Sequence, residues 1–318
     1  MIDLRNKKVI LTGGNGFLGS YIKKKLIEHG CQSIFIPTHD KYDLTEIESV
    51  RRMFATNPAD IVIHAAGDVG GIGYSRTYPA QQFYNNLMMN TLVMDQAYKH
   101  GIEKFVGIGS VCAYPKFTKV PFKEKDLWEG FPEETNAPYG LSKRMMLIQG
   151  QAYRQQYGFN AIHLLLINLY GPGDNFDPQS SHVIPAMIQK ILDVKEKGKK
   201  SVEVWGTGSA SREFVFVEDA AEGIVKATEM YDKAEPVNIG ADFEISIKDL
   251  IALLMSILNV HAELVWDTTK PDGQPRRRLD LTRAKKYFNY EPKVSLEEGL
   301  RRTIDWWLSN RNKEENDK

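Results

Sequence analysis

Tyr139 and Lys143 are the residues of this sequence whose types and spacing best suit catalysis. Residues four positions apart on a helix lie on one face, one turn from each other. A lysine ammonium group placed there favours the phenolate, so we expect the Tyr139 pKa to be lowered from its usual value of about 10. Ser110 ends an apolar segment predicted as a strand, and its hydroxyl is suited to holding a carbonyl or alcohol oxygen beside Tyr139. Together the three side chains suit proton transfer in alcohol and ketone chemistry.

A tyrosine and a lysine at this spacing occur easily by chance, so the interpretation depends on the elements that position them. Apolar runs of strand length lie at residues 8–12, 33–37, 60–64, 104–109 and 161–168. Helical patterns lie at residues 20–29, 83–100 and 139–157. This alternation predicts an α/β fold with a Rossmann-type, doubly wound parallel sheet. In the helix at 83–100, we expect Leu87, Thr91, Met94 and Tyr98 to face inward.

A glycine-rich turn follows the first predicted strand. The run G-G-N-G-F-L-G at residues 13–19 leads into the first helix, which Gly30 closes. Glycines there permit a tight turn and a close approach of the backbone to a pyrophosphate, whose charge a helix N-terminus favours. We therefore assign a dinucleotide cofactor to this turn, with the binding residues Gly13, Asn15, Gly16, Phe17, Leu18 and Gly19.

The end of the second strand normally meets the adenosine ribose of such a cofactor. An acidic residue there favours NAD, and an arginine favours the additional phosphate of NADP. This sequence has neither: Asn15, Thr38 and His39 occupy the neighbourhood, and Lys41 is its one firm cation. We assign His39 to the cofactor and Asp43 to its adenine. These residues leave the choice between NAD and NADP open.

The pattern changes after residue 172. We predict a cofactor domain over residues 1–172, with a segment near 214–242 returning to it, and a smaller α/β substrate domain over most of 173–318. Further elements are expected as helices from residue 183 and at 245–258 and 296–308, and as strands within 202–214 and at 236–240. A basic loop at 270–278 lies among Pro and Gly turns and suits an anionic ligand.

Composition argues against several classes of partner. The chain has 318 residues, enough for one large or two modest domains, and a formal net charge of zero. That balance does not suggest nucleic acid, and no apolar run approaches the roughly 18 residues of a membrane span. Two cysteines and a start unlike a secretion signal predict a cytoplasmic protein without disulfides. We assign no metal ligands.

Six longer motifs occur in order along the chain. They are A-A-G-D-V-G-G-I at 65–72, S-V-C-A-Y-P-K at 110–116, N-L-Y-G-P-G-D-N-F at 168–176, S-H-V-I-P-A at 181–186, V-W-G-T-G with R-E-F within 204–214, and K-P-D-G-Q-P-R at 270–276. With these motifs the chain resembles the GDP-L-fucose synthase family of the extended short-chain dehydrogenase/reductase superfamily, from about residue 8 to 307.

The resemblance implies a role for each candidate catalytic residue. Tyr139 would exchange the proton at carbon 4 of a 4-keto-6-deoxy GDP-sugar, Lys143 would hold the nicotinamide ribose, and Ser110 would orient the keto oxygen. Cys112 and His182 match the family's acid/base pair for epimerisation at carbons 3 and 5. Protons alpha to a ketone are acidic enough for a thiolate or an imidazole to remove near neutral pH.

The resemblance also implies binding residues. For the cofactor they are Ala65, Ala66, Gly67 and Asn168, together with Tyr139, Lys143 and His182. For the nucleotide sugar they are Val69, Lys190, Trp205, Arg212, Lys270 and Arg276. NADP(H) is favoured by the resemblance, but NAD(H) fits the absence of the family's usual phosphate-binding arginines near Asn15 and after the second strand. A homodimer through the helices at 83–100 and 139–157 is expected.

The predicted activity is therefore the conversion of GDP-4-keto-6-deoxy-D-mannose to GDP-L-fucose by a bifunctional epimerase and reductase. One alternative is a nucleotide-sugar 4-epimerase or dehydratase that retains NAD, and another is a reductase of a related GDP-keto-sugar. A third is a non-catalytic protein that senses a nucleotide sugar or a cofactor, because a fold alone does not fix function.

Overall fold

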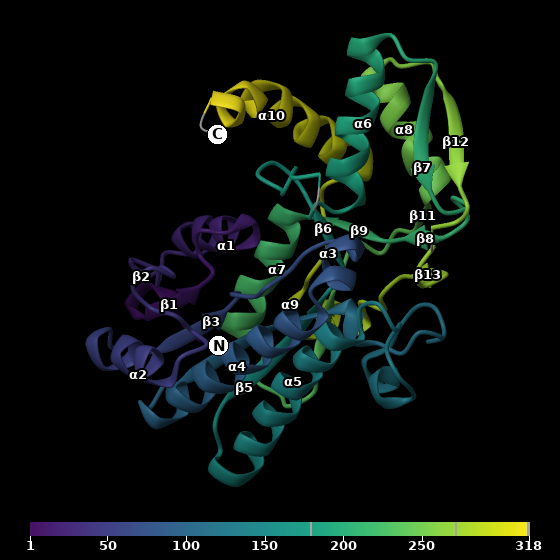
Figure 1. Ribbon diagram of the computed structural model, residues 1–318. Helices are drawn as coiled ribbons and strands as arrows, with labels where there is room; N and C mark the ends of the chain where they lie inside the picture. The colour runs from purple at the N-terminus through teal and green to yellow at the C-terminus, as the bar shows by residue number, and fades with distance from the viewer. Residues whose placement is uncertain (179, 271, 317–318) are drawn as a thin grey trace.

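A six-stranded parallel sheet forms the base of the computed structural model, which describes residues 1–178, 180–270 and 272–316 (Figure 1). The strand order is β10-β5-β4-β3-β1-β2, and all neighbours are parallel. The bounds are β1 (Lys8–Thr12), β2 (Ser33–Phe35), β3 (Ile61–His64), β4 (Lys104–Ser110), β5 (Ala161–Leu166) and β10 (Val237–Ile239). The predicted Rossmann-type sheet is confirmed.

Helices cover both faces of this sheet. The covering helices are α1 (Phe17–Glu28), α2 (Ile47–Thr56), α4 (Pro79–Lys99), α5 (Ala137–Tyr157) and α7 (Val217–Met230). Successive strand residues face opposite layers: Val9 and Leu11 pack in one core with α1 and α7, whereas Ile10 packs in another with α2 and α4. The strands read as continuous apolar runs because both faces are buried.

A second hydrophobic core lies above the carboxyl ends of these strands (Figure 1). It combines α6 (Val183–Lys197), α8 (Ile247–Leu258), α10 (Leu296–Asn316) and the parallel pair β7 (Ser201–Trp205) and β12 (Glu263–Asp267). Smaller pairings involve β6 (Asn168–Tyr170), β8 (Ser211–Arg212), β9 (Phe214–Phe216), β11 (Ile245–Ser246) and β13 (Arg276–Arg277). None of the described helices combines the length and apolarity needed to cross a membrane.

Two segments after residue 172 pack with the sheet. The first contains α7 and β10, and the second contains α9 (Thr282–Phe288), whose Ala284 and Phe288 join the core shared by β10. The return of this second segment is not predicted by the sequence patterns. It also expected a loop throughout 270–278, where Pro271 lies outside the described residues and β13 forms a short strand.

The inward face of α4 is more polar than predicted. Met94 is buried, as expected, but Thr91 is exposed and Leu87 is half-buried. The buried row contains Asn86 and Asn90 instead, because their amides hydrogen-bond the loop after β3, the His64 ring and the Ser142 carbonyl of α5. Apolar periodicity cannot reveal such a polar inward face.

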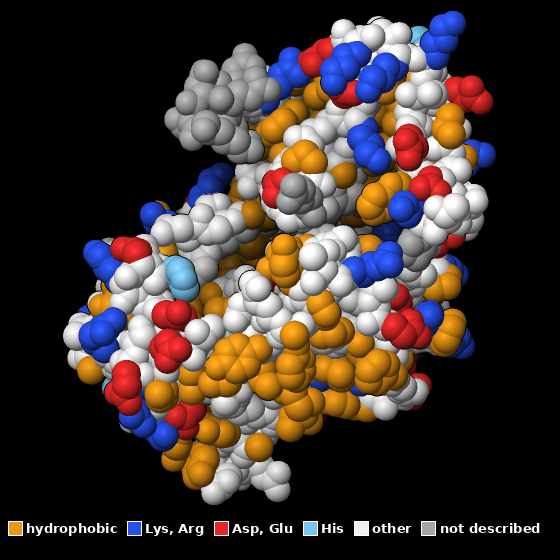
Figure 2. Space-filling view, viewed as in Figure 1, with side chains coloured by type: hydrophobic (Ala, Val, Ile, Leu, Met, Phe, Trp, Pro, Cys, Tyr) orange, Lys and Arg blue, Asp and Glu red, His pale blue; other side chains and the backbone are white. Residues whose placement is uncertain are grey.

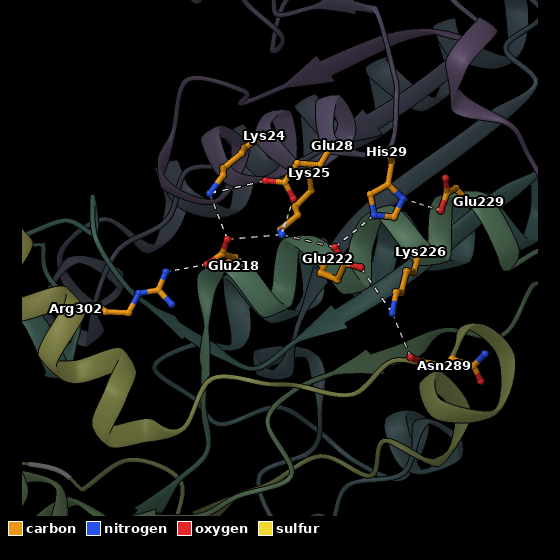
Figure 3. Close-up of polar contacts among 10 residues, drawn as sticks. All are labelled: Lys24, Lys25, Glu28, His29, Glu218, Glu222, Lys226, Glu229, Asn289 and Arg302. Carbon is orange, nitrogen blue, oxygen red and sulfur yellow. Dashed lines mark hydrogen bonds and ion pairs between the residues drawn. The ribbon is translucent and has the colours of Figure 1, made fainter.

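Charged side chains join α1, α7 and α10 (Figure 3). Glu218 of α7 lies 3.6 Å from the Lys25 ammonium of α1 and 2.8 Å from the Arg302 guanidinium of α10. At the other end of α7, Glu229 lies 3.0 Å from His29 Nδ1. The network thus connects a helix of the second core to the first helix of the Rossmann unit.

Asn238 of β10 offers a test of how the returning strand is held. Its buried side-chain amide donates to the carbonyls of Phe122 (2.9 Å) and Asp280 (3.1 Å), and accepts from the Tyr114 hydroxyl (2.7 Å). We predict that Asn238→Ala lowers the free energy of unfolding by about 2–4 kcal/mol, because it removes three hydrogen bonds and leaves the buried Tyr114 hydroxyl without its acceptor. Urea denaturation monitored by circular dichroism checks this. Exposed Asn6→Ala is the control, and equal effects of the two substitutions would contradict the prediction.

Candidate active site

The glycine turn after β1 fits a pyrophosphate. Gly13 has φ +69°, and a Cβ there would lie 2.7 Å from the Ala66 backbone nitrogen. A Cβ on Gly19 would lie 2.0 Å from the Gly13 carbonyl oxygen, so the helix and the turn can meet only at glycine. Helix α1 begins at Phe17 rather than at the predicted Ser20, which puts the assigned residues Phe17, Leu18 and Gly19 in its first turn. The N–H groups of a first turn have no intrahelical partners and attract anions.

A buried hydrogen-bond chain holds the loop after β3 against this turn. Thr12 Oγ1 lies 2.7 Å from His64 Nδ1, and His64 Nε2 lies 3.1 Å from Asn90 Oδ1. Burial, and secondarily the Lys143 charge, lowers the His64 pKa to about 3, so the ring is neutral. The Ala66 N–H also reaches Thr12 Oγ1, at 3.3 Å. The candidate cofactor residues at 65–66 are therefore brought beside Gly13.

The remainder of this loop is held by Asp68. Its carboxylate accepts from the Tyr74 hydroxyl (2.6 Å) and the Asn85 amide (2.9 Å), while its backbone exchanges hydrogen bonds with the Asn86 side chain. Farther along, the Gly71 N–H donates to the Ser180 carbonyl at 2.9 Å. The loop therefore connects the sheet to the segment before α6, with Val69 exposed between these anchors.

Ser110, Cys112 and Tyr139 meet at the carboxyl end of β4. Ser110 is the last residue of β4, and Cys112 lies in the single turn η2 (Val111–Ala113) that follows. A Cβ on Gly140 of α5 would lie only 2.2 Å from the Cys112 carbonyl oxygen. This close packing brings Tyr139, the neighbour of Gly140, beside Ser110, whose hydroxyl acts on the pKa of the phenol.

The proton affinities differ from the sequence-based expectation. Burial, followed by the influence of Cys112, raises the Tyr139 pKa well above its usual value, and the Ser110 hydrogen bond only partly opposes this. Burial lowers the Lys143 pKa to about 8. The Lys143 ammonium lies 5.7 Å from the centroid of the Tyr139 ring. The expectation of a lowered Tyr139 pKa was wrong, because desolvation of the buried phenol is the largest influence on its pKa. The phenol is therefore protonated at neutral pH.

Arg277 is a site residue that the sequence analysis did not single out. Its Nη1 donates to Cys112 Sγ at 3.8 Å, and its Nε donates to Gln274 Oε1 at 2.9 Å. His182 lies directly before α6, and desolvation, followed by the Arg277 charge, lowers its pKa. The predicted pair Cys112 and His182 thus shares Arg277 as a neighbour.

Arg276, the predicted residue of this arginine run, has a different environment. Its guanidinium is exposed and binds the Glu244 carboxylate, with distances of 3.0 and 2.5 Å. Side chains alternate along a strand, so Arg277 points inward from β13 where Arg276 points outward. The run of three arginines was visible in the sequence, but its register was not.

Arg212 lies near Arg277 on the adjacent strand β8, where the two residues are register partners. Its guanidinium donates to the Ser211 (2.7 Å) and Asp272 (2.9 Å) carbonyls, and burial followed by the Arg277 charge lowers its pKa to about 9. No carboxylate among the described residues forms an ion pair with either arginine. Two such guanidinium groups suit a phosphate-bearing ligand.

Three further candidate substrate residues lie together on the surface. Trp205, at the end of β7, is 53% exposed. The ammonium groups of Lys190 and Lys270 lie 5.8 and 5.4 Å from its ring centroid. The structure thus brings these predicted residues together as a charged aromatic surface.

The residues assigned to the far end of the cofactor are more scattered. Asn15 and His39 are exposed, and Asp43 accepts from the Thr45 N–H (2.8 Å) and hydroxyl (2.7 Å), which fixes a local turn. Arg52 of α2, which the sequence analysis did not consider, donates to the Lys41 carbonyl at 2.7 Å. Asn168 donates to the Glu213 carbonyl at 2.8 Å.

Comparison with known proteins agrees with this fold. The model of the NAD dependent epimerase/dehydratase family matches residues 9–240, so the chain belongs to that family and is a nicotinamide-cofactor enzyme of the short-chain dehydrogenase type. GDP-L-fucose synthase 1 from Arabidopsis thaliana is 40% identical over 306 residues, covering 96% of this chain and 94% of that protein. GDP-L-fucose synthase from Escherichia coli is 33% identical, covering 98% and 99%. Within the larger family, the chain therefore belongs to the GDP-L-fucose synthases.

A solved structure provides a further comparison. The GDP-mannoheptose C4 reductase from Campylobacter jejuni, with NADP bound, is 27% identical. It superposes with a TM-score of 0.87, covering 96% of this chain and 99% of that one.

Lys143 provides a pH test of this site. Below pH 8 the Lys143 ammonium is charged in both states, but it is poorly solvated in the folded protein and well solvated in the unfolded chain. This difference lowers the free energy of unfolding. The loss is full below the folded pKa of about 8 and disappears as the pH rises to the unfolded pKa of about 10.5. We predict that Lys143→Met raises the free energy of unfolding of the cofactor-free protein by about 1–3 kcal/mol at pH 7, and by less at pH 9.5. Urea denaturation at both pH values measures this. Exposed Lys23→Met is the control, and a gain independent of pH would refute the prediction.

Proposed function

We propose that the chain converts GDP-4-keto-6-deoxy-D-mannose to GDP-L-fucose, by epimerising carbons 3 and 5 and then reducing the keto group at carbon 4. The observation that carries this proposal is the meeting of Ser110, Cys112 and Tyr139 at the end of β4. The Ser110 hydroxyl and the Tyr139 phenol would bind the keto oxygen at carbon 4. The Cys112 thiol beside them would exchange protons at carbons 3 and 5. Membership of the GDP-L-fucose synthases supports the choice of sugar.

The epimerisation half uses proton transfers by side chains. Ser110 holds the keto oxygen and stabilises the negative charge that develops there when an alpha proton leaves. Cys112 removes the proton, and His182 returns one to the opposite face. The lowered His182 pKa favours easy proton loss.

The reduction half relies on Tyr139 as the acid. A bound nicotinamide cofactor supplies the hydride at carbon 4. Tyr139, whose phenol is protonated at neutral pH, donates its proton to the carbon-4 oxygen as that oxygen gains negative charge. Lys143, charged below about pH 8, holds the nicotinamide ribose and stabilises the phenolate that remains.

For the cofactor we propose NADP(H), with NAD(H) as the alternative. The C. jejuni reductase was solved with NADP bound. In this chain Arg52 and Lys41 supply cations near the loop after β2, where the family's usual arginines are missing. Arg212 would hold the GDP diphosphate, and Trp205 with its two lysines would lie along the nucleotide.

We further propose the domain boundary at residue 172, a homodimer and a cytoplasmic location. Two free thiols, Cys31 and Cys112, suit a reducing compartment. An apolar band covers the face of α4 and α5 (Figure 2). It includes exposed Tyr84, Met145 and Ile148. Contiguous apolar surface of this kind is typical of protein interfaces.

An NMR assay in deuterated water tests the activity. The purified enzyme receives the 4-keto-6-deoxy GDP-sugar and NADPH or NADH, with cofactor oxidation followed by absorbance and deuterium located by NMR. We predict that Tyr139→Phe lowers reduction by at least about 100-fold while exchange at carbons 3 and 5 continues, because only reduction needs the phenol.

Cys112→Ser provides the opposite comparison, since it should slow exchange at carbons 3 and 5 more than the hydride step. His182→Asn should yield product with incorrect stereochemistry. Reduction without any exchange would favour a simple reductase of another GDP-keto-sugar. Retained NAD and no turnover with either cofactor would favour the epimerase or dehydratase alternative.

The proposed dimer has its own test. We predict that Met145→Glu combined with Ile148→Glu gives a monomer, because two charges enter an interface that must exclude water. Light scattering after size-exclusion chromatography measures the mass. Ile27→Glu, at an exposed isoleucine of α1, should leave the dimer intact. A wild-type monomer at micromolar concentration would contradict the proposal.

A further inference from the structure

The Arg277 guanidinium is built into the protein rather than extended into solvent. The residue is 8% exposed and lies on β13 in register with Arg212 of β8. Its Nη1 donates to Cys112 Sγ at 3.8 Å, within the range of a hydrogen bond to sulfur. Cys112 is half-buried in the turn directly after β4. A cationic donor therefore faces the sulfur from a distant part of the chain.

Gln274 fixes the position of this donor. It is 2% exposed, and its Oε1 accepts from Arg277 Nε at 2.9 Å. Its Nε2 donates to the carbonyls of Pro115 (3.0 Å) and Lys116 (2.9 Å). Both carbonyls belong to the segment that leaves the Cys112 turn. Gln274 therefore locks the guanidinium to the same loop that carries the thiol.

The charges nearest to Cys112 are positive, and the carboxylates of Asp272 and Glu133 act on Arg212 beside them. Arg277 is the nearest, and Arg212 also interacts with the sulfur. Tyr139 faces it from α5 and holds its proton firmly, because burial raises the tyrosine pKa. His182, the other titratable neighbour of Arg277, has a lowered pKa and so adds little positive charge at neutral pH. Among the described residues, no carboxylate forms an ion pair with Arg277.

We infer that Arg277 holds Cys112 in its thiolate form and that Gln274 is the positioning residue for Arg277. A thiolate is the reactive form of cysteine, and neighbouring cations favour it. The inference deepens the proposed function, on which its use in epimerisation rests. The sulfur lone pair takes the proton alpha to the ketone, and the electron pair of that C–H bond becomes the enolate. His182, in its imidazolium form, returns a proton on the other face, and proton exchange with water then restores the thiolate and the imidazolium.

Thiol alkylation tests the inference without any substrate. The full-length enzyme, in a Cys31→Ala background that leaves one thiol, is treated with iodoacetamide from pH 5.5 to 10, and labelling of Cys112 is followed by mass spectrometry. We expect Arg277→Met to slow labelling at pH 7 by about tenfold or more, with equal rates at pH 10, where the thiol ionises in both proteins. Arg277→Lys should restore part of the rate.

Two further variants separate position from charge. Gln274→Leu keeps the guanidinium but releases it, and should shift the rate–pH profile less than Arg277→Met. Arg276→Met is the matched control, because that neighbour is exposed and paired with Glu244; its profile should equal that of the parent. Thermal denaturation and cofactor binding confirm that each variant folds. If Arg277→Met does not fold, Arg277→Lys and Gln274→Leu carry the test.

The outcomes distinguish this inference from the proposed function. A parental rate–pH profile in folded Arg277→Met, or in both remaining variants, overturns the role of Arg277. A shifted profile together with undiminished deuterium exchange in Cys112→Ser supports the thiolate, but removes Cys112 as the epimerisation base. A shifted profile with lost exchange in Cys112→Ser supports both.

Discussion

The close approach of α5 to the end of β4 is the constraint on which the site depends. A side chain as small as a methyl group on Gly140 would collide with the Cys112 carbonyl oxygen at 2.2 Å. Glycine at that position lets Tyr139 reach Ser110 and Cys112. The reacting groups thus come from a strand end, a single turn and a helix, which are rigid elements and hold geometry better than free loops.

A second constraint joins the two cores around the same site. The buried Glu213 carboxylate accepts from the backbone N–H groups of Ala241 (2.5 Å), Asp242 (2.9 Å) and Leu279 (2.6 Å). Glu213 directly follows Arg212, and Leu279 lies two residues after Arg277. The Glu213 side chain therefore fixes the two strands that carry the Arg212 and Arg277 guanidinium groups. Burial raises the Glu213 pKa to about 7.

Function and stability oppose each other here. Burial lowers the pKa of Lys143 to about 8 and that of Arg212 to about 9, so both charged forms are held where they are poorly solvated. Such an arrangement persists because the surrounding packing and backbone hydrogen bonds fix it, and it keeps cations ready for anionic ligands. Arg277 differs in having a specific partner in Cys112.

The sequence by itself determined the Rossmann sheet, the glycine turn, the Tyr139–Lys143 pair and the family, because strand and helix periods and motif spacing are local properties of the chain. It placed the helix start three residues late, and it missed the return of α9 to the sheet. Only the tertiary structure decided that Arg277 rather than Arg276 faces Cys112, since that depends on the register of a two-residue strand. It also decided that Tyr139 holds its proton tightly, because desolvation depends on everything packed around the phenol and not on the lysine one turn away.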